Sequence, residues 1–184
     1  MSSLQKFHRR TNGGVPAVKL IGSEAPVAGA GFYLGLAGDG TSYMYVAPKS
    51  TESTTLAWGG PGVLSGATSL TDGVTNTTTL ANAGSLITTG HPAAYYCKNL
   101  STGGYNTWYL PAKNELNTLY SNKSATPFAT ANAFTYSGAY YWSSTEYSST
   151  LAWKQNLTNG YQNQNGGKQW TGGYTTRAVR RSLI

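Results

Sequence analysis

Short aromatic motifs in the second half of the chain limit its possible folds more than any other feature. They occupy residues 108–111, 141–146 and 152–153, and an arginine-containing motif follows at residues 177–181. Between the last two motifs the chain consists mostly of Tyr, Trp, Ser, Thr, Asn, Gln and Gly. Aromatic residues and Thr favour strands, whereas Gly, Ser and Asn favour turns. The pattern predicts a protein rich in β-structure and turns, with few groups for acid, base or metal chemistry.

The composition indicates one folded domain. A chain of 184 residues is long enough to bury a core of its own. Charged residues make up 10% of it and aromatic residues 12%, whereas disordered chains combine high charge with few aromatics.

The positive charge of the chain is concentrated near its start. The net charge is +7 because the chain has only six acidic residues. Four bases and no acid lie within the first 23 residues, so we interpret residues 1–24 as a basic arm. Such an arm either docks on an acidic surface or is a solvated tail. We do not expect nucleic-acid binding, because the body of the chain has no basic stripe with interleaved aromatics.

The cysteine content and hydropathy predict folding in a reducing cytosol. Cys97 is a lone cysteine and cannot form an intramolecular disulfide, so we interpret it as a small buried hydrophobic residue. No signal peptide is visible, and no stretch approaches the roughly 20 apolar residues of a membrane span, so membrane insertion is not expected.

Hydrophobic periodicity and turn signals predict both strands and helices. The expected strands cover residues 31–36, 43–47, 140–144, 151–157 and 177–181, with turns at 38–40, 159–160 and 166–167. The expected helices cover residues 91–100, with Thr88 or Thr89 as its cap, and 111–120. In the second helix, Leu116, Leu119 and Tyr120 would face the core. Residues 48–84 are expected to pack as irregular structure.

These motifs together resemble a known family. The resemblance rests on residues 30–33, 47–48, 58–59, 76–77, 93–94, 97, 103–111, 115–116, 141–146, 152–153, 168 and 177–181. Over residues 27–181 the chain resembles the Lcl C-terminal-type domain, a C-type-lectin-like fold common in phage tail and virion proteins and in bacterial surface adhesins. The resemblance implies an α+β domain over residues 25–184, with two helices packed on a twisted antiparallel sheet and long irregular loops. Thr107 stands where the family commonly has an acid.

The inventory of reactive side chains argues against an enzyme. Glu146 is expected to form an ion pair with the arginines of residues 177–181, and Glu115 to stabilise the start of its helix. Neither carboxylate has the second acid or histidine that acid–base chemistry needs. His91, the one histidine outside the arm, lies at a helix entry, where capping or packing is expected. We therefore predict no catalytic residue.

Metal ions and cofactors are not expected either. The six acids are scattered, whereas Ca²⁺ needs 6–8 oxygen ligands, and the Glu-Pro-Asn and Trp-Asn-Asp tripeptides of calcium-binding lectins are missing. His8, His91 and Cys97 lack the spacing of a zinc site.

The segment 147–174 is the candidate binding surface. Its aromatic side chains alternate with amides and hydroxyls, a composition that resembles an antibody paratope and suits sugar rings. The predicted ligand-binding residues are Tyr147, Asn156, Asn159, Tyr161, Gln162, Asn163, Gln164, Asn165, Trp170 and Tyr174. The alternative interpretation treats these amides as ordinary loop residues and Trp170 as core. Residues predicted to be structural are Trp108, Pro111, Glu115, Trp142, Glu146, Trp153, Arg177 and Arg180, with Trp153 in the core.

These expectations combine into one functional hypothesis. We expect a non-enzymatic phage virion surface protein, a capsid or tail decoration (cement) protein that displays a lectin-like adhesive face. Its arm would dock on other virion proteins through Lys6, Phe7, Arg9, Arg10 and Lys19. One alternative is a tail-fibre receptor-binding module for a host glycan or protein, and another is a bacterial surface adhesin. The protein would assemble in the host cytoplasm as a homo-oligomer, a trimer among the options, and be exposed on the particle.

Overall fold

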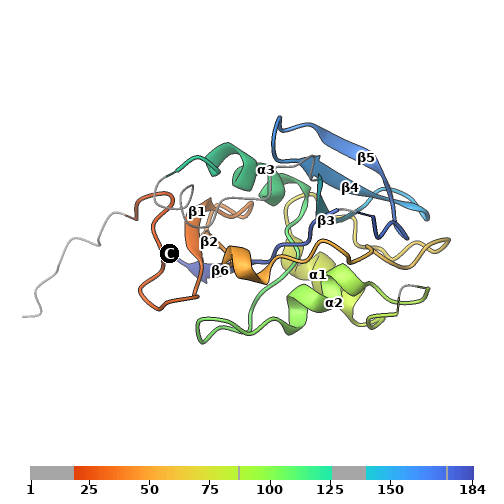
Figure 1. Ribbon diagram of the computed structural model, residues 1–184, viewed down its shortest axis with the longest axis horizontal. Coiled ribbons are helices and arrows are strands. Elements are labelled where there is room, and N and C mark those ends of the chain that lie inside the picture. Colours follow the sequence, from red (N-terminus) through yellow and green to blue (C-terminus); the bar gives the residue numbers. More distant parts are fainter. Residues whose placement is uncertain (1–18, 87, 126–139, 173) are drawn as a thin grey trace, which may run out of the picture.

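The chain folds into an α+β structure with two small antiparallel sheets and three α-helices in the ranges that the structure describes. This computed structural model describes residues 19–86, 88–125, 140–172 and 174–184 (Figure 1). The first sheet has the strand order β1-β2-β6, and the second has the order β3-β4-β5.

The first sheet joins both ends of the described chain. It consists of β1 (Phe32–Leu36), β2 (Ser42–Val46) and β6 (Val179–Leu183). Asp39 accepts hydrogen bonds from the backbone N–H groups of Thr41 and Ser42, which forms the predicted turn between β1 and β2. β6 begins two residues later than predicted, because residues 177 and 178 belong to the segment that approaches the sheet.

The second sheet contains one strand that the sequence did not predict. It consists of β3 (Tyr140–Glu146), β4 (Leu151–Asn156) and β5 (Gln162–Gly167). We expected residues 166 and 167 to form a turn, but they pair with the start of β4. The predicted turn at Asn159-Gly160 is present, and Gly160 adopts a positive φ of 82° there.

Three α-helices are present in the described residues, where we expected two. α2 (Pro92–Asn99) and α3 (Lys113–Asn122) confirm the predictions, whereas α1 (Gly73–Ala81) lies in a region expected to be irregular. A short 3₁₀ helix, η1 (Lys49–Thr51), lies in the same region. The prediction of a threonine cap for α2 was wrong. The N-cap is His91, and its side chain makes no cap hydrogen bond there.

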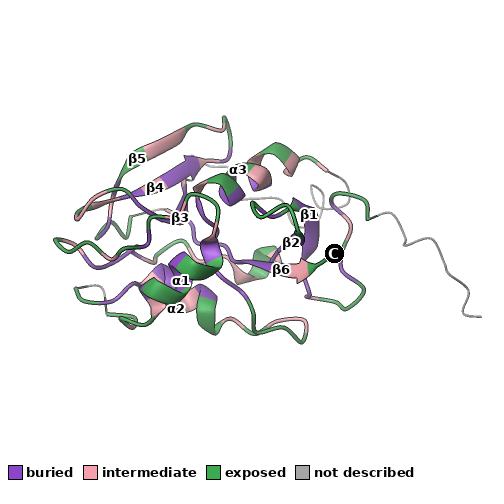
Figure 2. Cartoon of the chain, turned by 180° about the vertical axis from the view of Figure 1, so that it is seen from behind, coloured by how far each residue is buried: buried purple, intermediate pink, exposed green. Residues whose placement is uncertain are grey.

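Two large clusters of buried side chains form most of the core, and a smaller third cluster consists of Ala25, Ala30, Tyr33 and Tyr45. In the first, α3 packs on β1 and β3, and it buries Leu116 and Leu119 as predicted, with Tyr120 against their edge. The second cluster lies between α1, α2 and β3 and is built around Trp58, Trp108 and Trp142. Figure 2 shows the buried β4 and the exposed outer surfaces of α1, α2 and α3.

The last residues of the predicted arm contact the first sheet. The backbone N–H of Gly22 donates to the carbonyl of Tyr33, and the N–H of Tyr33 donates to the carbonyl of Ser23. Ala25 donates to the carbonyl of Gly31 in the same ladder. The described chain therefore begins at the end of the molecule that also holds its C-terminus (Figure 1).

Candidate binding surface

Several loops meet at the end of the molecule opposite the C-terminus, and we call this region the loop end. It comprises residues 59–66, which we call the tip loop, with residues 147–150 and 168–172 (Figure 1). Backbone hydrogen bonds hold them together: Gly59 donates to Lys168, Gly62 to Ser149, and Lys168 to Thr150. Loops far apart in the sequence therefore form one continuous surface.

Glycines allow the tip loop to fold tightly. Gly59, Gly60, Gly62 and Gly66 all have a positive φ, which residues with a Cβ rarely adopt. A Cβ at Gly59 would lie 2.1 Å from the carbonyl oxygen of Gly90, so the loop sits directly on the entry to α2.

The tip loop presents two exposed aliphatic side chains. Val63 is 68% exposed and Leu64 is 69% exposed. Isolated exposed aliphatics are common on protein surfaces. Here they are adjacent in a loop that backbone hydrogen bonds hold to the rest of the domain. A rigid pair of apolar side chains is suited to contact with a partner.

A buried ion pair fixes the tip loop. The Nζ atom of Lys168 lies 2.6 Å from Oε1 of Glu146, and both side chains are sealed from solvent. The Glu146 carboxylate also accepts hydrogen bonds from the backbone N–H groups of Ser65 and Gly66. The ammonium of Lys168 donates to the carbonyl of Val63. One ion pair therefore holds the second half of the tip loop, from Val63 to Gly66.

These contacts keep Glu146 ionised. Burial alone acts to raise the pKa of its carboxyl, but the hydrogen bonds from Lys168 and Ser65 outweigh that effect. The pKa of Glu146 consequently lies below its ordinary value. A carboxylate held in this state is a structural anchor and is poorly suited to donate or shuttle protons.

A groove of about 320 Å³ runs between the tip loop and Trp170. It is lined by Pro61, Thr150, Gly167, Lys168, Gln169 and Trp170. The indole of Trp170 is 52% exposed, and its Nε1–H donates to the carbonyl of Gly172 at 3.0 Å. The ring of Tyr174 lies 6.0 Å from that of Trp170, at an interplanar angle of 40°. The indole is thus exposed but oriented by its neighbours.

A second cavity of about 300 Å³ lies on the other side of the tip loop. Its lining includes Gly60, Val63, Ser65, Thr79, Ala83, Thr88, Thr89 and His91. His91 is buried, and its Nδ1 lies 3.2 Å from the carbonyl oxygen of Trp58. Burial lowers the pKa of His91 and favours the neutral imidazole. The cavity wall therefore combines apolar surface with four hydroxyl groups, from Ser65, Thr79, Thr88 and Thr89, and a neutral ring.

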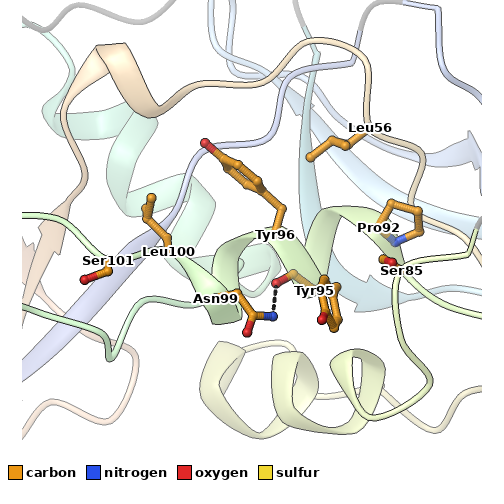
Figure 3. Close-up of a pocket in the computed structure, with 8 residues that line it drawn as sticks. All are labelled: Leu56, Ser85, Pro92, Tyr95, Tyr96, Asn99, Leu100 and Ser101. Atoms are coloured by element: carbon orange, nitrogen blue, oxygen red, sulfur yellow. Dashed lines mark hydrogen bonds between the residues drawn. The ribbon is translucent and has the colours of Figure 1, made fainter.

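A third groove, of about 410 Å³, lies along α2. Figure 3 shows the side chains of Leu56, Pro92, Tyr95 and Tyr96 around it, with the Asn99 amide donating to the carbonyl of Tyr95. The other lining residues are Ser85, Leu100 and Ser101. The lining residues of this groove include no acid, histidine or cysteine, and its surface is mostly apolar.

The structure separates the predicted ligand-binding residues. Tyr147 and Trp170 lie at the loop end and are exposed. Tyr161 is also exposed, but it lies at the opposite end of β5, on the order of 20 Å from Gly167 along the strand. Asn163, Gln164 and Asn165 belong to β5 itself. These residues therefore do not form one compact patch.

Four predicted binding amides have structural contacts, and one of them is Asn163, whose side-chain oxygen accepts from the backbone N–H of Asn165. The side-chain oxygen of Asn156 accepts from the backbone N–H groups of Thr158 and Asn159, which closes the β4–β5 turn. Asn159 accepts from the N–H of Tyr161 in the same turn. The Gln162 amide donates to the carbonyl of Lys113 on α3. The turn amides shape the backbone, as expected of Asn in tight turns.

Tyr174 is half-buried beneath Trp170. Its ring packs edge-on against Trp142 at 4.7 Å, and its hydroxyl accepts a hydrogen bond from Lys154. The ammonium of Lys154 also lies 4.2 Å from the ring centre of Tyr140. The predicted binding residue Tyr174 therefore connects the exposed indole to the core.

Two structural predictions were wrong. Trp153 was expected in the core, but it is half-buried on the α3 side of β4, where Lys113 lies 4.4 Å above its ring and Tyr147 packs edge-on. Glu146 was expected to pair with the closing arginines, but it pairs with Lys168. The reason is topological, because β3 pairs with β4, whereas β6 pairs with β2.

The closing arginines have other acidic partners. Arg177 pairs with Glu52 at 2.9 Å. Arg181 lies 2.7 Å from Glu115 and also contacts Asp39 and Asp72, at 3.1 and 3.7 Å. The guanidinium of Arg180 is stacked between aromatic rings, 3.8 Å from the ring centre of Tyr105 and 4.2 Å from that of Tyr45.

The other predicted structural residues are buried. Trp108, Pro111, Trp142, Glu115, Arg177 and Arg180 are all shielded from solvent. The Glu115 carboxylate accepts from the backbone N–H of Ala112 and from the hydroxyl of Tyr109, so it fixes the start of α3.

The predicted anchoring residues are described only in part. Lys6, Phe7, Arg9 and Arg10 lie outside the described residues. Lys19 donates to the hydroxyl of Tyr45, and its ammonium lies 4.2 Å from the ring centre of Tyr43. In the described ranges, no helix is long and apolar enough to cross a membrane, and no group of three His, Cys, Asp or Glu residues could hold a metal ion.

Comparison with known families agrees with the resemblance found in the sequence. Residues 50–180, more than two thirds of the chain, match the profile of the Lcl C-terminal domain. The matched range includes the tip loop, the Glu146–Lys168 pair and Trp170. No curated protein matches the chain.

Proposed function

The chain belongs to the Lcl C-terminal domain family, and on that premise we propose that it is a non-enzymatic surface protein of a phage particle. Within this role it acts as a decoration (cement) protein of the capsid or tail. The adhesive face is the loop end, and the anchoring element is the basic arm. In its finer architecture the domain is C-type-lectin-like, which agrees with its helices, antiparallel sheets and long loops.

The observation that carries this proposal is that the described part of the arm and the loop end lie at opposite ends of the molecule (Figure 1). The described part of the arm, which includes Lys19, packs on the first sheet, and the loop end lies at the opposite end of the molecule (Figure 1). A protein attached through its arm would therefore present the tip loop and Trp170 away from the attachment point. This geometry suits a protein that coats one surface and exposes another.

The state of the acidic residues supports a role in binding instead of catalysis. Five of the six acids form ion pairs that stabilise the fold, namely Asp39, Glu52, Asp72, Glu115 and Glu146. Burial raises the pKa of the Cys97 thiol, which makes it a poor nucleophile. The described nucleophiles and carboxylates therefore lack the arrangement that hydrolysis would need.

A receptor-binding role is the second candidate, and the exposed side chains of the loop end favour it. Val63, Leu64, Tyr147 and Trp170 are each at least half exposed. Rigid aromatic and aliphatic anchors of this kind dominate recognition surfaces. The same surface could serve a tail-fibre module that engages a host glycan or protein, or a bacterial surface adhesin.

Imaging the protein on particles tests the decoration proposal. We expect density for the domain at symmetric sites on the capsid or tail, with the loop end facing outward. Deleting residues 1–18 should abolish incorporation while the domain remains folded. Particles that load the truncated protein normally would contradict the anchoring role of the arm, and density confined to a fibre tip would favour the receptor-binding alternative.

A further inference from the structure

The indole of Trp170 is exposed and held in one orientation, so a ligand ring can stack on it. It is half exposed, yet its Nε1–H donates a hydrogen bond to the carbonyl of Gly172, and its ring contacts the ring of Tyr174. A Cβ at Gly172 would lie 3.0 Å from the indole, so this glycine supports the ring from close range. Tyr174 in turn packs against the buried Trp142. The exposed ring is therefore connected to the core by a chain of aromatic contacts and loses little conformational entropy when a ligand stacks on it.

The two walls of the neighbouring groove are joined beneath its floor. Pro61 belongs to the wall formed by the tip loop, and Gln169 and Trp170 belong to the wall formed by residues 168–172. Lys168 reaches from the second wall to the carbonyl of Val63, and Glu146 holds the Ser65 N–H. The two walls are thus joined by a buried ion pair, together with the backbone hydrogen bonds from Gly59 to Lys168 and from Gly62 to Ser149.

The groove is electrically neutral, although the chain as a whole is basic. Among the described residues that line it, Lys168 carries a charge, but its side chain has no exposed surface and is neutralised by Glu146 at 2.6 Å. The exposed polar side chains are the Thr150 hydroxyl and the Gln169 amide. Both can donate and accept hydrogen bonds without a charge.

We propose that this groove binds one uncharged sugar ring, which stacks on Trp170 and is oriented by Thr150 and Gln169. The C–H face of a pyranose is attracted to the negative face of an indole, and its hydroxyls match an amide and a hydroxyl. A volume of about 320 Å³ lies at the small end of the range for ligand sites, which favours a single ring. This inference rests on the proposed adhesive function and names the ligand class of its surface.

The inference is tested by NMR titration of the full chain. The chain has five tryptophans, and each gives one indole N–H signal. The Trp170 signal is assigned by its loss in Trp170→Phe. The probes are the methyl glycosides of glucose, galactose, mannose and N-acetylglucosamine, each at up to about 50 mM, well above a millimolar Kd. We expect at least one glycoside to shift the Trp170 signal and leave those of the buried Trp58, Trp108 and Trp142 in place.

Matched variants separate stacking from general surface effects. Trp170→Ala should weaken binding about tenfold or more, followed through the Gln169 side-chain amide signal. Gln169→Ala should also weaken it, followed through the Trp170 signal. Tyr161→Ala is the control, because Tyr161 is 58% exposed but lies at the far end of β5. We expect it to bind like the original protein.

Two results would overturn the inference. One is the absence of a Trp170 shift with every neutral glycoside, and the other is unchanged affinity in Trp170→Ala. Neither result affects particle decoration, which imaging measures without any sugar. Conversely, a protein that binds a glycoside but is absent from particles would refute the decoration role and leave the groove assignment intact.

Discussion

Glu146 and Lys168 form an ion pair of 2.6 Å in which both side chains are removed from solvent. They are 22 residues apart and come from the end of β3 and the segment after β5. Between them they bind three backbone groups of the tip loop, at Val63, Ser65 and Gly66. The pair therefore links the second sheet to the surface that we propose to be functional.

Removing one partner of this pair should destabilise the protein strongly. Lys168→Met leaves the Glu146 carboxylate buried without its counter-charge, and such changes cost about 3–5 kcal/mol. The double variant Glu146→Gln with Lys168→Met should lose less, because a glutamine carbonyl can still accept from Ser65. Urea denaturation measures the free energy of unfolding of both variants. Gln169→Ala, at the neighbouring exposed position, is the control and should stay within about 0.5 kcal/mol of the original protein.

The same pair should produce a dependence of stability on pH. Burial acts to raise the pKa of Glu146, yet the bonds from Lys168 and Ser65 lower it overall, so the folded pKa lies below the ordinary 4.5. As the pH falls through that range, the unfolded chain takes up the proton first, and the contribution of Glu146 to stability is lost. Glu146→Gln should therefore show a shallower loss of melting temperature than the original protein between about pH 6 and pH 3. Parallel curves for the two proteins would refute this role of Glu146.

Two glycines of the tip loop should respond very differently to the same substitution. Gly59 and Gly62 both have a positive φ, of 92° and 83°. A Cβ at Gly59 would lie 2.1 Å from the carbonyl oxygen of Gly90, whereas a Cβ at Gly62 has no neighbour within 4 Å. Gly62→Ala should lower the free energy of unfolding by about 1–2 kcal/mol, because alanine disfavours a positive φ. Gly59→Ala adds a clash with the backbone and should cost about 3 kcal/mol or more. Thermal unfolding by circular dichroism compares them, and equal costs would mean that the loop does not rest on the entry to α2.

The elements that the sequence predicted are those with strong local signals. β1, β2, β3 and β4 carry aromatic or β-branched residues, and α2 begins with a proline at its first position. α3 shows its buried Leu116 and Leu119 at helical spacing. In these segments local preference and tertiary packing agree, so sequence reasoning was sufficient.

The missed elements depend on tertiary contacts. α1 contains four threonines and one valine among its nine residues, a composition that disfavours helices. It forms because Asp72 caps its start and because Thr77 and Leu80 are buried against the second cluster. β5 has the sequence QNQNGG, which lacks strand preference, and it is a strand because β4 offers an unpaired edge.

The candidate site could be predicted only in part. The exposure of Tyr147, Tyr161 and Trp170 agrees with a surface role, but their separation depends on the direction of β5, which was not predicted. The tip loop has the sequence GGPGVLSG, which is a composition typical of a flexible linker. Its importance arises from the Glu146–Lys168 pair, and no local pattern indicates that these two residues meet.

The boundary of the arm leads to the last prediction. Gly22, Ser23 and Ala25 form three backbone hydrogen bonds with the first sheet, each worth about 1 kcal/mol. Deleting residues 1–18 preserves these bonds and should leave the melting temperature nearly unchanged. Deleting residues 1–25 removes them and exposes the edge of β1, so the melting temperature should fall by roughly 6–12 °C.

An exposed strand edge also promotes association between chains, so the longer deletion should form aggregates that size-exclusion chromatography detects. If both truncated proteins melt alike, residues 19–25 contribute nothing to the fold, and the arm can be treated as a detachable unit up to residue 25. If they differ as expected, a loss of particle binding caused by the longer deletion would reflect damage to the domain. The shorter deletion is therefore the one that isolates anchoring, because it leaves the contacts of Lys19 with Tyr43 and Tyr45 in place.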